Sequence, residues 1–372
     1  MRVIIVSGAI YPSLYPRAFR ATELATAMSN MGHQVVLYGT LGNYDYTNFK
    51  KETGVIVKNI GKSKWGNVNS DLPVPTGAHR FTIRKVVNYA FTRLFHSIID
   101  YPFSEYFFLV KRVLKKEPPA DLLITVAVPY GIHWAAANHI RHFGHNKFKR
   151  WIADCGDPMM GNLMNKYNPF FLAPIERYWC KYADKIVVPF EKAKEGYYPE
   201  FRDKMEAIPQ SIDFSKVRIE SYRKNDIPTF FYCGTVYEGI RDPSLLLEYL
   251  CTIDRPFRFI VYSKSRLFDV FQDRLGGKLE IKQPIPRLDL IRVMSTMDFL
   301  INISNDSDVQ LPSKLIDYGL SQRPILNISS RFSDNEIELF NRMLNGDYSR
   351  TVVIDNLSQY DSRIVARRFL SI

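Results

Sequence analysis

Short apolar runs alternate with amphipathic stretches along most of the chain. The first run, Arg2–Ser7, is typical of a parallel strand that is buried on both faces. Residues Ala18–Met31 then place their apolar side chains at helical spacing, and Gly32 follows as a C-terminal cap. Val35–Tyr38 is the next apolar run. This order predicts a right-handed βαβ unit with a ligand site at the carboxyl end of its first strand.

The same alternation continues to the end of the chain, except in residues 41–79, which are polar and give no clear pattern. An α/β fold is therefore expected, and 372 residues suffice for two domains with separate cores. The pattern predicts helices at Ile132–His142, from about Pro243, at Arg287–Met297 and at Ser362–Leu370. It predicts further strands at Asp121–Val128, Arg150–Ala153, Pro228–Cys233, Phe257–Tyr262, Leu279–Ile281, Phe299–Ile303 and Pro324–Ile328.

The composition is that of a globular protein, with 46% hydrophobic and 24% charged residues. The cysteines lack CxxC spacing, which argues against a disulfide framework or a zinc site and for a reducing compartment. The first residues do not form a secretion signal, and no apolar run reaches the roughly 18 residues of a membrane span. We therefore expect a cytoplasmic protein.

The net charge of +12 favours an anionic partner: a nucleic acid, an acidic lipid or a phosphorylated substrate. Residues 80–116 contribute most visibly, since eight basic residues stand there against two acidic ones, a net charge of +6, with aromatic residues interleaved. Two amphipathic helices that break near Tyr101 and Pro102 would explain this pattern. Such helices can bind peripherally to an anionic membrane surface at its inner face, or can simply turn their aromatic side chains to the core. No nucleic-acid-binding motif accompanies them, so nucleic acid is not expected as a partner.

Loops after the strands of the first half carry candidate catalytic residues. Asp154 and Asp157 follow the strand Arg150–Ala153, where carboxylates can bind an acceptor hydroxyl or transfer a proton. The alternative is a turn that aspartates stabilise. His133 begins the helix after Asp121–Val128 and is a further catalytic candidate, with a purely structural histidine as the alternative.

The loop after the first strand begins at Gly8 and lacks the GxGxxG pattern, which excludes a nicotinamide dinucleotide site of that type. It leads to Arg20, either an anion-binding residue or a helix-surface charge. In the second half, Gly234 and Lys264 end two successive strands, and Arg241 precedes a helix. These two cations either converge on one diphosphate or are ordinary surface charges.

The most informative segment is Gln310–Asn327, which reads QLPSKLIDYGLSQRPILN. A short amphipathic helix starts after Leu311, and its N-terminus together with Ser313 and Lys314 forms a receptor for phosphate. Asp317, one turn later, can accept hydrogen bonds from a sugar hydroxyl. The alternative is an ordinary β-loop-α-β unit with a solvated cap.

This segment resembles the PSK region of retaining GT-B glycosyltransferases of family 4, of the capsule and lipopolysaccharide type. Residues 7–39 resemble the opening of the same enzymes, and DCGDPMMGN resembles one of their cleft loops. The resemblance implies a GT-B fold, α/β, with two Rossmann-like doubly wound domains that face a central cleft. Residues 1–207 would bind the acceptor, with 356–372 packing back on them, and residues 208–355 would bind the nucleotide-sugar.

The resemblance further implies transfer of a sugar from a nucleotide-diphosphate donor to a saccharide or polyprenyl-linked acceptor in bacterial surface polysaccharide synthesis. Retention at the anomeric carbon is implied, with no metal and no cofactor, and UDP and GDP are not distinguished. The catalytic candidates are Asp157, Asp154 and His133, the last as a substitute for a family histidine that this chain lacks. The donor-binding candidates are Gly8, Arg20, Gly234, Arg241, Lys264, Leu311, Ser313, Lys314 and Asp317.

Three other classes remain open. Asp306 and Asp308 form a DxD pair, which in GT-A glycosyltransferases holds a divalent metal. A sugar-nucleotide epimerase uses the same GT-B scaffold with other cleft residues. A non-enzymatic membrane-binding function would explain the positive charge. It would not explain the two α/β halves, whose loops can bind phosphate.

Overall fold

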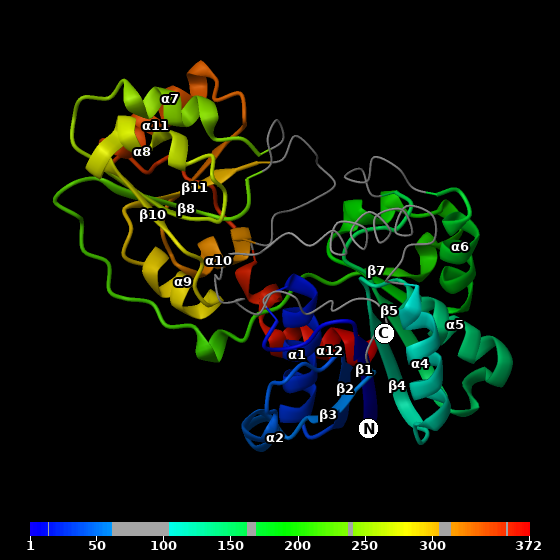
Figure 1. The fold of residues 1–372 in the computed structure, drawn as a ribbon. Coiled ribbons are helices and arrows are strands. Elements are labelled where there is room, and N and C mark those ends of the chain that lie inside the picture. The colour runs from blue at the N-terminus through cyan, green and yellow to red at the C-terminus, as the bar shows by residue number, and fades with distance from the viewer. Residues whose placement is uncertain (14, 62–103, 162–168, 237–240, 305–313, 355) are drawn as a thin grey trace, which may run out of the picture. The chain divides into compact units, whose positions relative to one another are not determined.

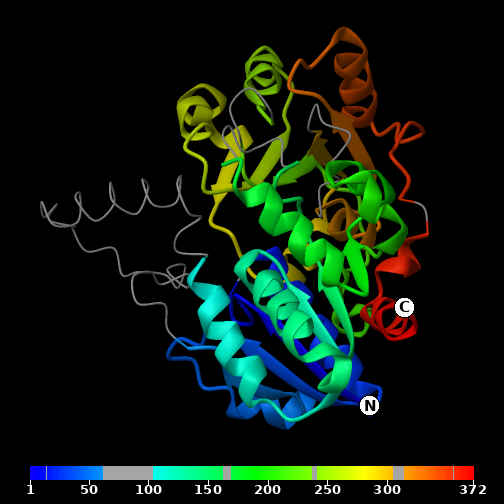
Figure 2. The same ribbon diagram turned by 90° about the vertical axis from the view of Figure 1, so that its right-hand side faces the viewer.

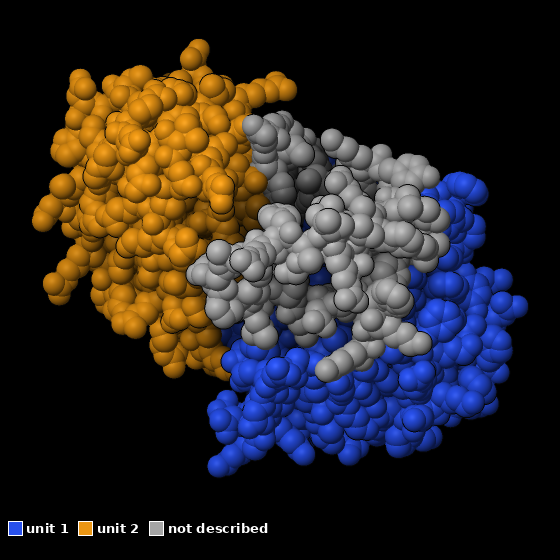
Figure 3. All heavy atoms as spheres, viewed as in Figure 1, with its two compact units in different colours: residues 1–213, 360–372 blue, residues 214–359 orange. Residues whose placement is uncertain are grey.

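Two parallel sheets form the frame of the protein (Figure 1). The computed structural model describes residues 1–13, 15–61, 104–161, 169–236, 241–304, 314–354 and 356–372. The chain divides into unit 1, residues 1–213 with 360–372, and unit 2, residues 214–359 (Figure 3). Each unit has its own sheet with helices on both faces, which confirms the α/β class and the two Rossmann-like domains.

In unit 1 the described strands follow the order β3-β2-β1-β4-β5-β6-β7, and all of their pairings are parallel. From β1 to β3 the strands are added on one side of β1, and from β4 to β7 on the other side. The strand order therefore reverses between β1 and β4. In chain order the strands are β1 Arg2–Ser7, β2 Gln34–Gly39, β3 Ile56–Asn59, β4 Ala120–Val126, β5 Phe148–Asp154, β6 Lys185–Val188 and β7 Met205–Ala207.

Side chains alternate across the sheet of unit 1 as the strand period requires. Val3 and Ile5 of β1 face α1 and α12, while Ile4 and Val6 face α4, α5 and α6. Helices α4 and α5 pack against each other, as both ribbon views show (Figure 2). The helices are α1 Pro16–Asn30, α2 Thr47–Thr53, α4 Glu105–Lys116, α5 Gly131–Phe143, α6 Leu172–Tyr182 and α12 Ser362–Ser371.

Unit 2 repeats the plan with the strand order β10-β9-β8-β11-β12. Its strand order reverses between β8 and β11. Phe230 of β8 stacks on Phe259 and Phe299 of the neighbouring strands, with ring centroids 4.8 and 5.0 Å apart. The elements are β8 Thr229–Cys233, α7 Ser244–Cys251, β9 Arg258–Tyr262, α8 Asp269–Leu275, β10 Leu279–Lys282, α9 Arg287–Met294, β11 Phe299–Ile303, α10 Lys314–Leu320, β12 Ile325–Ile328 and α11 Asp334–Leu344.

Most predicted elements are present with small shifts at their ends. Strands β1 and β11 begin and end where the apolar runs predicted, and Gly32 caps α1 with φ +84. Helix α9 ends at Met294 rather than Met297. Helix α2 and strand β3, in the segment that gave no pattern, were missed because α2 buries none of its residues. Of residues 80–116, those from 80 to 103 lie outside the described part, and α4 covers most of the rest.

The two reversal points decide where ligands are expected. In open parallel sheets, a crevice forms at the carboxyl ends of the strands where the order reverses. In unit 1 this edge carries the loops that follow β1 and β4, and in unit 2 it carries those that follow β8 and β11. No helix in the described ranges is long and apolar enough to cross a membrane.

Candidate functional site

At the reversal point of unit 1, Gly8 follows β1 and lies against Pro129, which follows β4. A Cβ atom at Gly8 would collide with the pyrrolidine ring of Pro129, so only glycine fits at this position. The structure thus explains Gly8 by close packing of the two loops, and its predicted contact with the donor stays a prediction.

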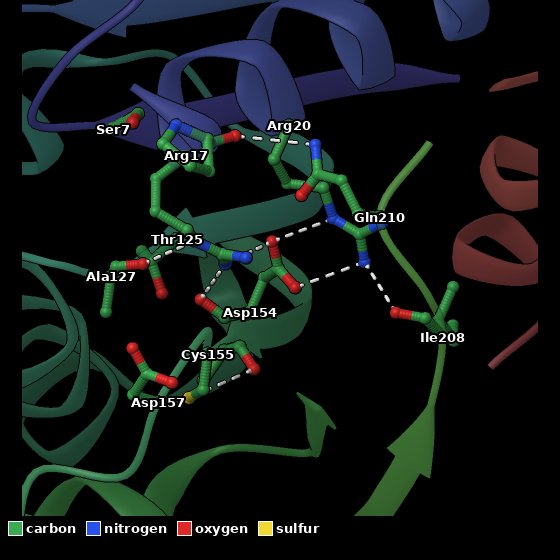
Figure 4. A network of polar contacts seen from close by, with 12 residues as sticks. Ser7, Arg17, Arg20, Thr125, Ala127, Asp154, Cys155, Asp157, Ile208 and Gln210 are labelled. Atoms are coloured by element: carbon green, nitrogen blue, oxygen red, sulfur yellow. Dashed lines mark hydrogen bonds and ion pairs between the residues drawn. The ribbon is translucent and has the colours of Figure 1, made fainter. Parts of the chain in front are cut away.

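A buried ion network lies beside these loops (Figure 4). The carboxylate of Asp154 accepts hydrogen bonds from Arg17 at 2.7 Å and from Arg20 at 3.1 and 3.2 Å. Only 1% of the Arg20 and Asp154 side chains is exposed. Burial lowers the pKa of Arg20 from its ordinary value, and the charge of Asp154 opposes this shift. The pair therefore stabilises two charges that burial alone would disfavour.

Arg20 also joins parts of unit 1 that are distant in sequence. It donates hydrogen bonds to the backbone carbonyls of Ile208 and Pro209, and its guanidinium lies 4.8 Å from the ring centroid of Phe369 in α12. Arg17 donates to the carbonyl oxygens of Ala127 and Asp154. Arg20 was predicted to bind the donor and Asp154 to act in catalysis, but here both side chains are directed at protein groups. Arg17 ends the loop predicted after the first strand, but it was not among the residues predicted to bind the donor.

His133 is fully enclosed by protein. Its Nδ1 lies 2.7 Å from Thr125 Oγ1, and its Nε2 lies 3.5 Å from Cys155 Sγ. Burial lowers the pKa of His133 to about 3, so the ring is neutral near pH 7. These contacts agree with the structural interpretation of this histidine, and its catalytic role is not carried into the proposal below.

Asp157 has the opposite character, because its side chain is exposed on a loop that is firmly held. Its backbone carbonyl accepts hydrogen bonds from the hydroxyls of Tyr130 and Tyr197. The loop is also held just after Asp157, where the backbone amides of Met159 and Met160 donate hydrogen bonds to the carboxylate of Glu176 in α6 at 2.9 and 3.3 Å.

Glu176 is fully buried, and burial raises its pKa while the two amides oppose the shift. The loop that follows β5 is therefore fixed on both sides of the exposed carboxylate of Asp157. Glu176 belongs to α6, which is distant from Asp157 in sequence, and no sequence pattern indicated that it would hold this loop.

In unit 2 the central residue is Lys314, the first residue of α10. Its Nζ is shielded from solvent and has no hydrogen-bond partner within the described ranges. The Nζ atom lies 4.6 Å from the ring centroid of Tyr232 in β8. Burial lowers the pKa of Lys314 to about 7. The side chain also lies beside Gly234, which ends β8 with φ +131, so Lys314 sits at the reversal point of this sheet.

Other predicted donor-binding residues gather around Lys314. The charge of Arg241 further lowers the pKa of Lys314, and it also acts on Tyr232, the ring that Lys314 Nζ contacts. Ser263 Oγ donates to the carbonyl of Gly234 at 2.9 Å and joins the ends of β8 and β9. Lys264 follows at the same edge and is exposed. Within the part of unit 2 that the structure describes, no carboxylate contributes to the shift of Lys314.

Asp317 lies one turn after Lys314 and is paired with Arg287, the first residue of α9. The guanidinium atoms Nη2 and Nε lie 2.7 and 2.8 Å from Asp317 Oδ1. Burial raises the pKa of Asp317, and the charge of Arg287 opposes the shift. The sequence did not predict Arg287 as a partner for this carboxylate. Leu311 and Ser313 lie outside the described residues.

No group of three or more histidine, cysteine or acidic side chains in the described ranges could hold a metal ion. Asp306 and Asp308, on which the metal-dependent alternative rests, lie outside those ranges. That alternative therefore remains untested by the structure.

No family model matches the chain, and no curated protein matches it in sequence. Solved structures share its fold over its whole length. Its match to the lipopolysaccharide outer core galactosyltransferase WaaB has a TM-score of 0.60 and 11% identity, and covers 100% of this chain and 98% of that one. For a Staphylococcus aureus TarM variant in complex with UDP, the TM-score is 0.56 and the identity 10%, with coverages of 100% and 97%.

A putative UDP-N-acetylglucosamine 2-epimerase from Listeria monocytogenes matches with a TM-score of 0.57 and 12% identity, over 100% of this chain and 95% of that one. Identities this low establish the fold alone. The fold is that of the GT-B glycosyltransferases, as the resemblance in sequence implied.

The ion network predicts unequal effects of two neighbouring aspartates on stability. Asp154→Ala leaves Arg20 buried without its counter-charge and should lower the free energy of unfolding by about 3–5 kcal/mol. Asp157→Ala removes an exposed side chain and should change it by less than about 0.5 kcal/mol. Urea denaturation of both variants measures this difference. Equal effects would show that the Asp154 network is not the main source of stability at this edge.

Proposed function

We propose that the protein is a glycosyltransferase that moves a sugar from a nucleotide-diphosphate donor to a hydroxyl group of a saccharide or lipid-linked acceptor. The observation that carries the proposal is the environment of Lys314. Its buried Nζ has no partner in the described residues, and its close neighbour Arg241 is also a cation. A buried charge without a counter-charge is costly, and a bound anion removes that cost. The GT-B fold and the UDP in the TarM complex support a nucleotide diphosphate as this anion.

The chemistry that this arrangement serves is stabilisation of the leaving group. As the bond between the sugar and the β-phosphate breaks, negative charge develops on the phosphate oxygens. Lys314 and Arg241 lie together at the edge where that charge is expected, with Lys264 on the adjacent loop. Fixed positive groups in a partly dehydrated site lower the barrier most strongly where charge appears. Asp317, held by Arg287, is then available to orient a sugar hydroxyl.

For the acceptor side we propose Asp157 in unit 1. Its carboxylate is exposed on a loop that Tyr130, Tyr197 and Glu176 fix, so it can be held against an acceptor hydroxyl. Asp154 and His133 are buried, whereas Asp157 is exposed, which favours Asp157 of the three. Retention at the anomeric carbon, membership of family 4 and a role in bacterial surface polysaccharide synthesis are part of the same proposal. They rest on the resemblance of the PSK segment and on the likeness to WaaB.

A sugar-nucleotide epimerase is the second candidate, because one of the matching structures is described as such an enzyme. The two activities differ in their products. A glycosyltransferase transfers the sugar to an acceptor, or slowly to water, and releases the nucleoside diphosphate, whereas an epimerase changes the sugar and keeps the nucleotide attached. Incubation with UDP- and GDP-sugars, followed by chromatography of the nucleotides, separates them.

The low pKa of Lys314 predicts that nucleotide binding takes up a proton. At pH 8 the free amine is mostly neutral, and a bound diphosphate should return it to the charged form. Calorimetric titration with UDP and GDP, in buffers of different ionisation enthalpy, should show uptake of about one proton at pH 8 and about none at pH 6. Since the pKa is lowered, the sign is fixed: affinity should fall as pH rises above about 7.

Two variants test this assignment. Lys314→Arg keeps the charge at all pH values and should abolish the proton uptake, whereas Lys314→Met should weaken binding by about 1.5–3 kcal/mol. Lys224→Met removes a lysine of unit 2 that lies well before β8 and serves as the matched control. Binding that is equal in Lys314→Met and wild type, or absent for both nucleotides, would refute the proposed donor site.

The cluster of cations also predicts independence from metal ions. Because Lys314, Arg241 and Lys264 supply positive charge, turnover should be unchanged after treatment with EDTA. Product release is measured with and without the chelator. A loss of activity that Mn²⁺ or Mg²⁺ restores would instead favour the metal-dependent alternative at Asp306 and Asp308.

Peripheral binding to an anionic membrane is a further part of the proposal. The exposed surface of α4 supports it. Phe108, Lys111, Arg112 and Lys115 form an exposed stripe along this helix, which we name the basic stripe. Phe108 is 68% exposed, although the opposite side of the helix, including Val110 and Leu114, is buried. An exposed aromatic ring among cations is typical of helices that lie at a lipid surface.

The basic stripe predicts salt-sensitive binding to vesicles. Each cation near an anionic surface contributes about 1 kcal/mol, so Lys111→Gln with Lys115→Gln should reduce binding to phosphatidylglycerol vesicles strongly at low salt. Lys50→Gln with Lys51→Gln removes the same charge from α2 and should have little effect. Sedimentation with anionic and neutral vesicles measures both. If both double variants pellet as the wild type does, α4 is not the membrane-binding surface.

A further inference from the structure

The exposed tyrosines of the described residues lie in two neighbouring loops of unit 1. Among the residues that the structure describes, the tyrosines with exposed rings are Tyr11, Tyr15 and Tyr44, at 42%, 44% and 39%. The first two lie between β1 and α1, and the third lies between β2 and α2. Both loops follow the carboxyl ends of adjacent strands, at the edge of unit 1 that also carries Asp157.

Four aromatic rings make up this cluster, which we name the tyrosine cluster: Tyr11, Tyr44, Tyr46 and Phe49. Tyr11 stacks on Phe49 with ring centroids 6.0 Å apart and an angle of 16° between the rings. Tyr44 meets Tyr11 edge to face, with centroids 5.4 Å apart and an angle of 87°. The two exposed rings, Tyr11 and Tyr44, are therefore nearly perpendicular and form a corner, to which each ring contributes an apolar face.

The corner is held in place by hydrogen bonds from both loops. The backbone amide of Tyr11 donates to Thr22 Oγ1 of α1 at 3.0 Å, and the hydroxyl of Tyr46 donates to the carbonyl of Tyr11. A side-chain hydrogen bond with Tyr11 raises the pKa of Tyr44 from its ordinary value. Rings that are fixed before binding lose little conformational entropy when a ligand packs on them.

The chemistry of this surface fits a sugar. The faces of a pyranose ring carry C–H groups that pack on aromatic rings, and its edges carry hydroxyls that exchange hydrogen bonds with phenolic oxygens. Tyrosine offers both kinds of contact in one side chain. Neutral hydroxyls next to apolar faces suit such a ligand better than a charged one.

The place of the cluster in the sheet indicates which sugar it would hold. Strands in a sheet lie about 4.8 Å apart. Strand β5, which leads to Asp157, is two strands away from β1 and three from β2. The strand spacing alone therefore separates the tyrosine cluster from the Asp157 loop by roughly 10–15 Å along this edge. The full separation is larger, because Tyr46 and Phe49 pack on the face of the sheet that α1 covers and Met159 packs on the opposite face. A sugar on the cluster is then not the one that reacts at Asp157.

We propose that the tyrosine cluster binds a distal sugar residue of an oligosaccharide acceptor, while the reacting hydroxyl lies at Asp157. The proposal rests on the glycosyltransferase function above and adds to it the class of acceptor: a chain of several neutral sugars rather than a single sugar or a bare lipid. The cluster thereby selects acceptors by length.

Direct binding tests the proposal without the donor. Saturation-transfer NMR and titration are carried out with linear tetrasaccharides of glucose, galactose, mannose or N-acetylglucosamine. At least one should bind the wild-type protein, and Tyr11→Ala and Tyr44→Ala should each weaken it about tenfold, which corresponds to about 1.4 kcal/mol. Phe170→Ala, which removes a more exposed ring elsewhere in unit 1, should leave binding unchanged.

Kinetics then distinguish a distal site from the reacting site. In Tyr44→Ala, KM for an oligosaccharide acceptor should rise about tenfold with kcat and donor hydrolysis unchanged, and a monosaccharide acceptor should be unaffected. Failure of all four tetrasaccharides to bind, or equal binding by Tyr11→Ala, Tyr44→Ala and wild type, would overturn the proposal. A chain that binds these sugars through the cluster but no UDP or GDP would overturn the donor assignment and keep the sugar site.

Discussion

The ion pairs between Asp154 and the two arginines of α1 are the constraint on which unit 1 depends. A carboxylate at the end of β5 holds Arg17 and Arg20, and Arg20 in turn binds the carbonyls of Ile208 and Pro209. Since charges this deeply buried are tolerated only when every partner is in place, the network fixes the helix, the strand end and the connecting chain together. Asp157, three residues later, is by contrast exposed.

In both units a reversal of strand order brings two loops together, but the residues at the two reversal points differ in character. In unit 1 the reversal point is filled, since Gly8 packs against Pro129 and only a residue without a side chain fits there. In unit 2 the corresponding edge holds a lysine whose ammonium group has no described partner. The sheet order brings loops together in either case, but the residues on them decide whether the loops pack closely or enclose a cation.

The sequence predicted the fold well, because buried parallel strands are read directly as apolar runs, as β1 and β11 show. Helix α2 escaped prediction since it buries no side chain and so leaves no period. For the candidate site, the PSK segment singled out Lys314, which lies beside Gly234 at the sheet edge of unit 2, and its contact with a donor stays a prediction. What no local pattern could give were the long-range partners: Arg287 for Asp317, Glu176 for the Asp157 loop, and Asp154 for Arg20. A charge in a loop looks the same in sequence whether its partner is water or a buried counter-ion.

The return of α12 to unit 1 has a consequence for how the protein is made. Val365, Ala366 and Phe369 are fully buried against a sheet that starts at Arg2, so the core of unit 1 contains residues synthesised both before and after the whole of unit 2. During translation, one face of α1 and the guanidinium of Arg20 lack their Phe369 contact until the rest of unit 1, the whole of unit 2 and α12 have left the ribosome. Unit 2 can therefore complete its core first, and the unit that is synthesised first is the last to close.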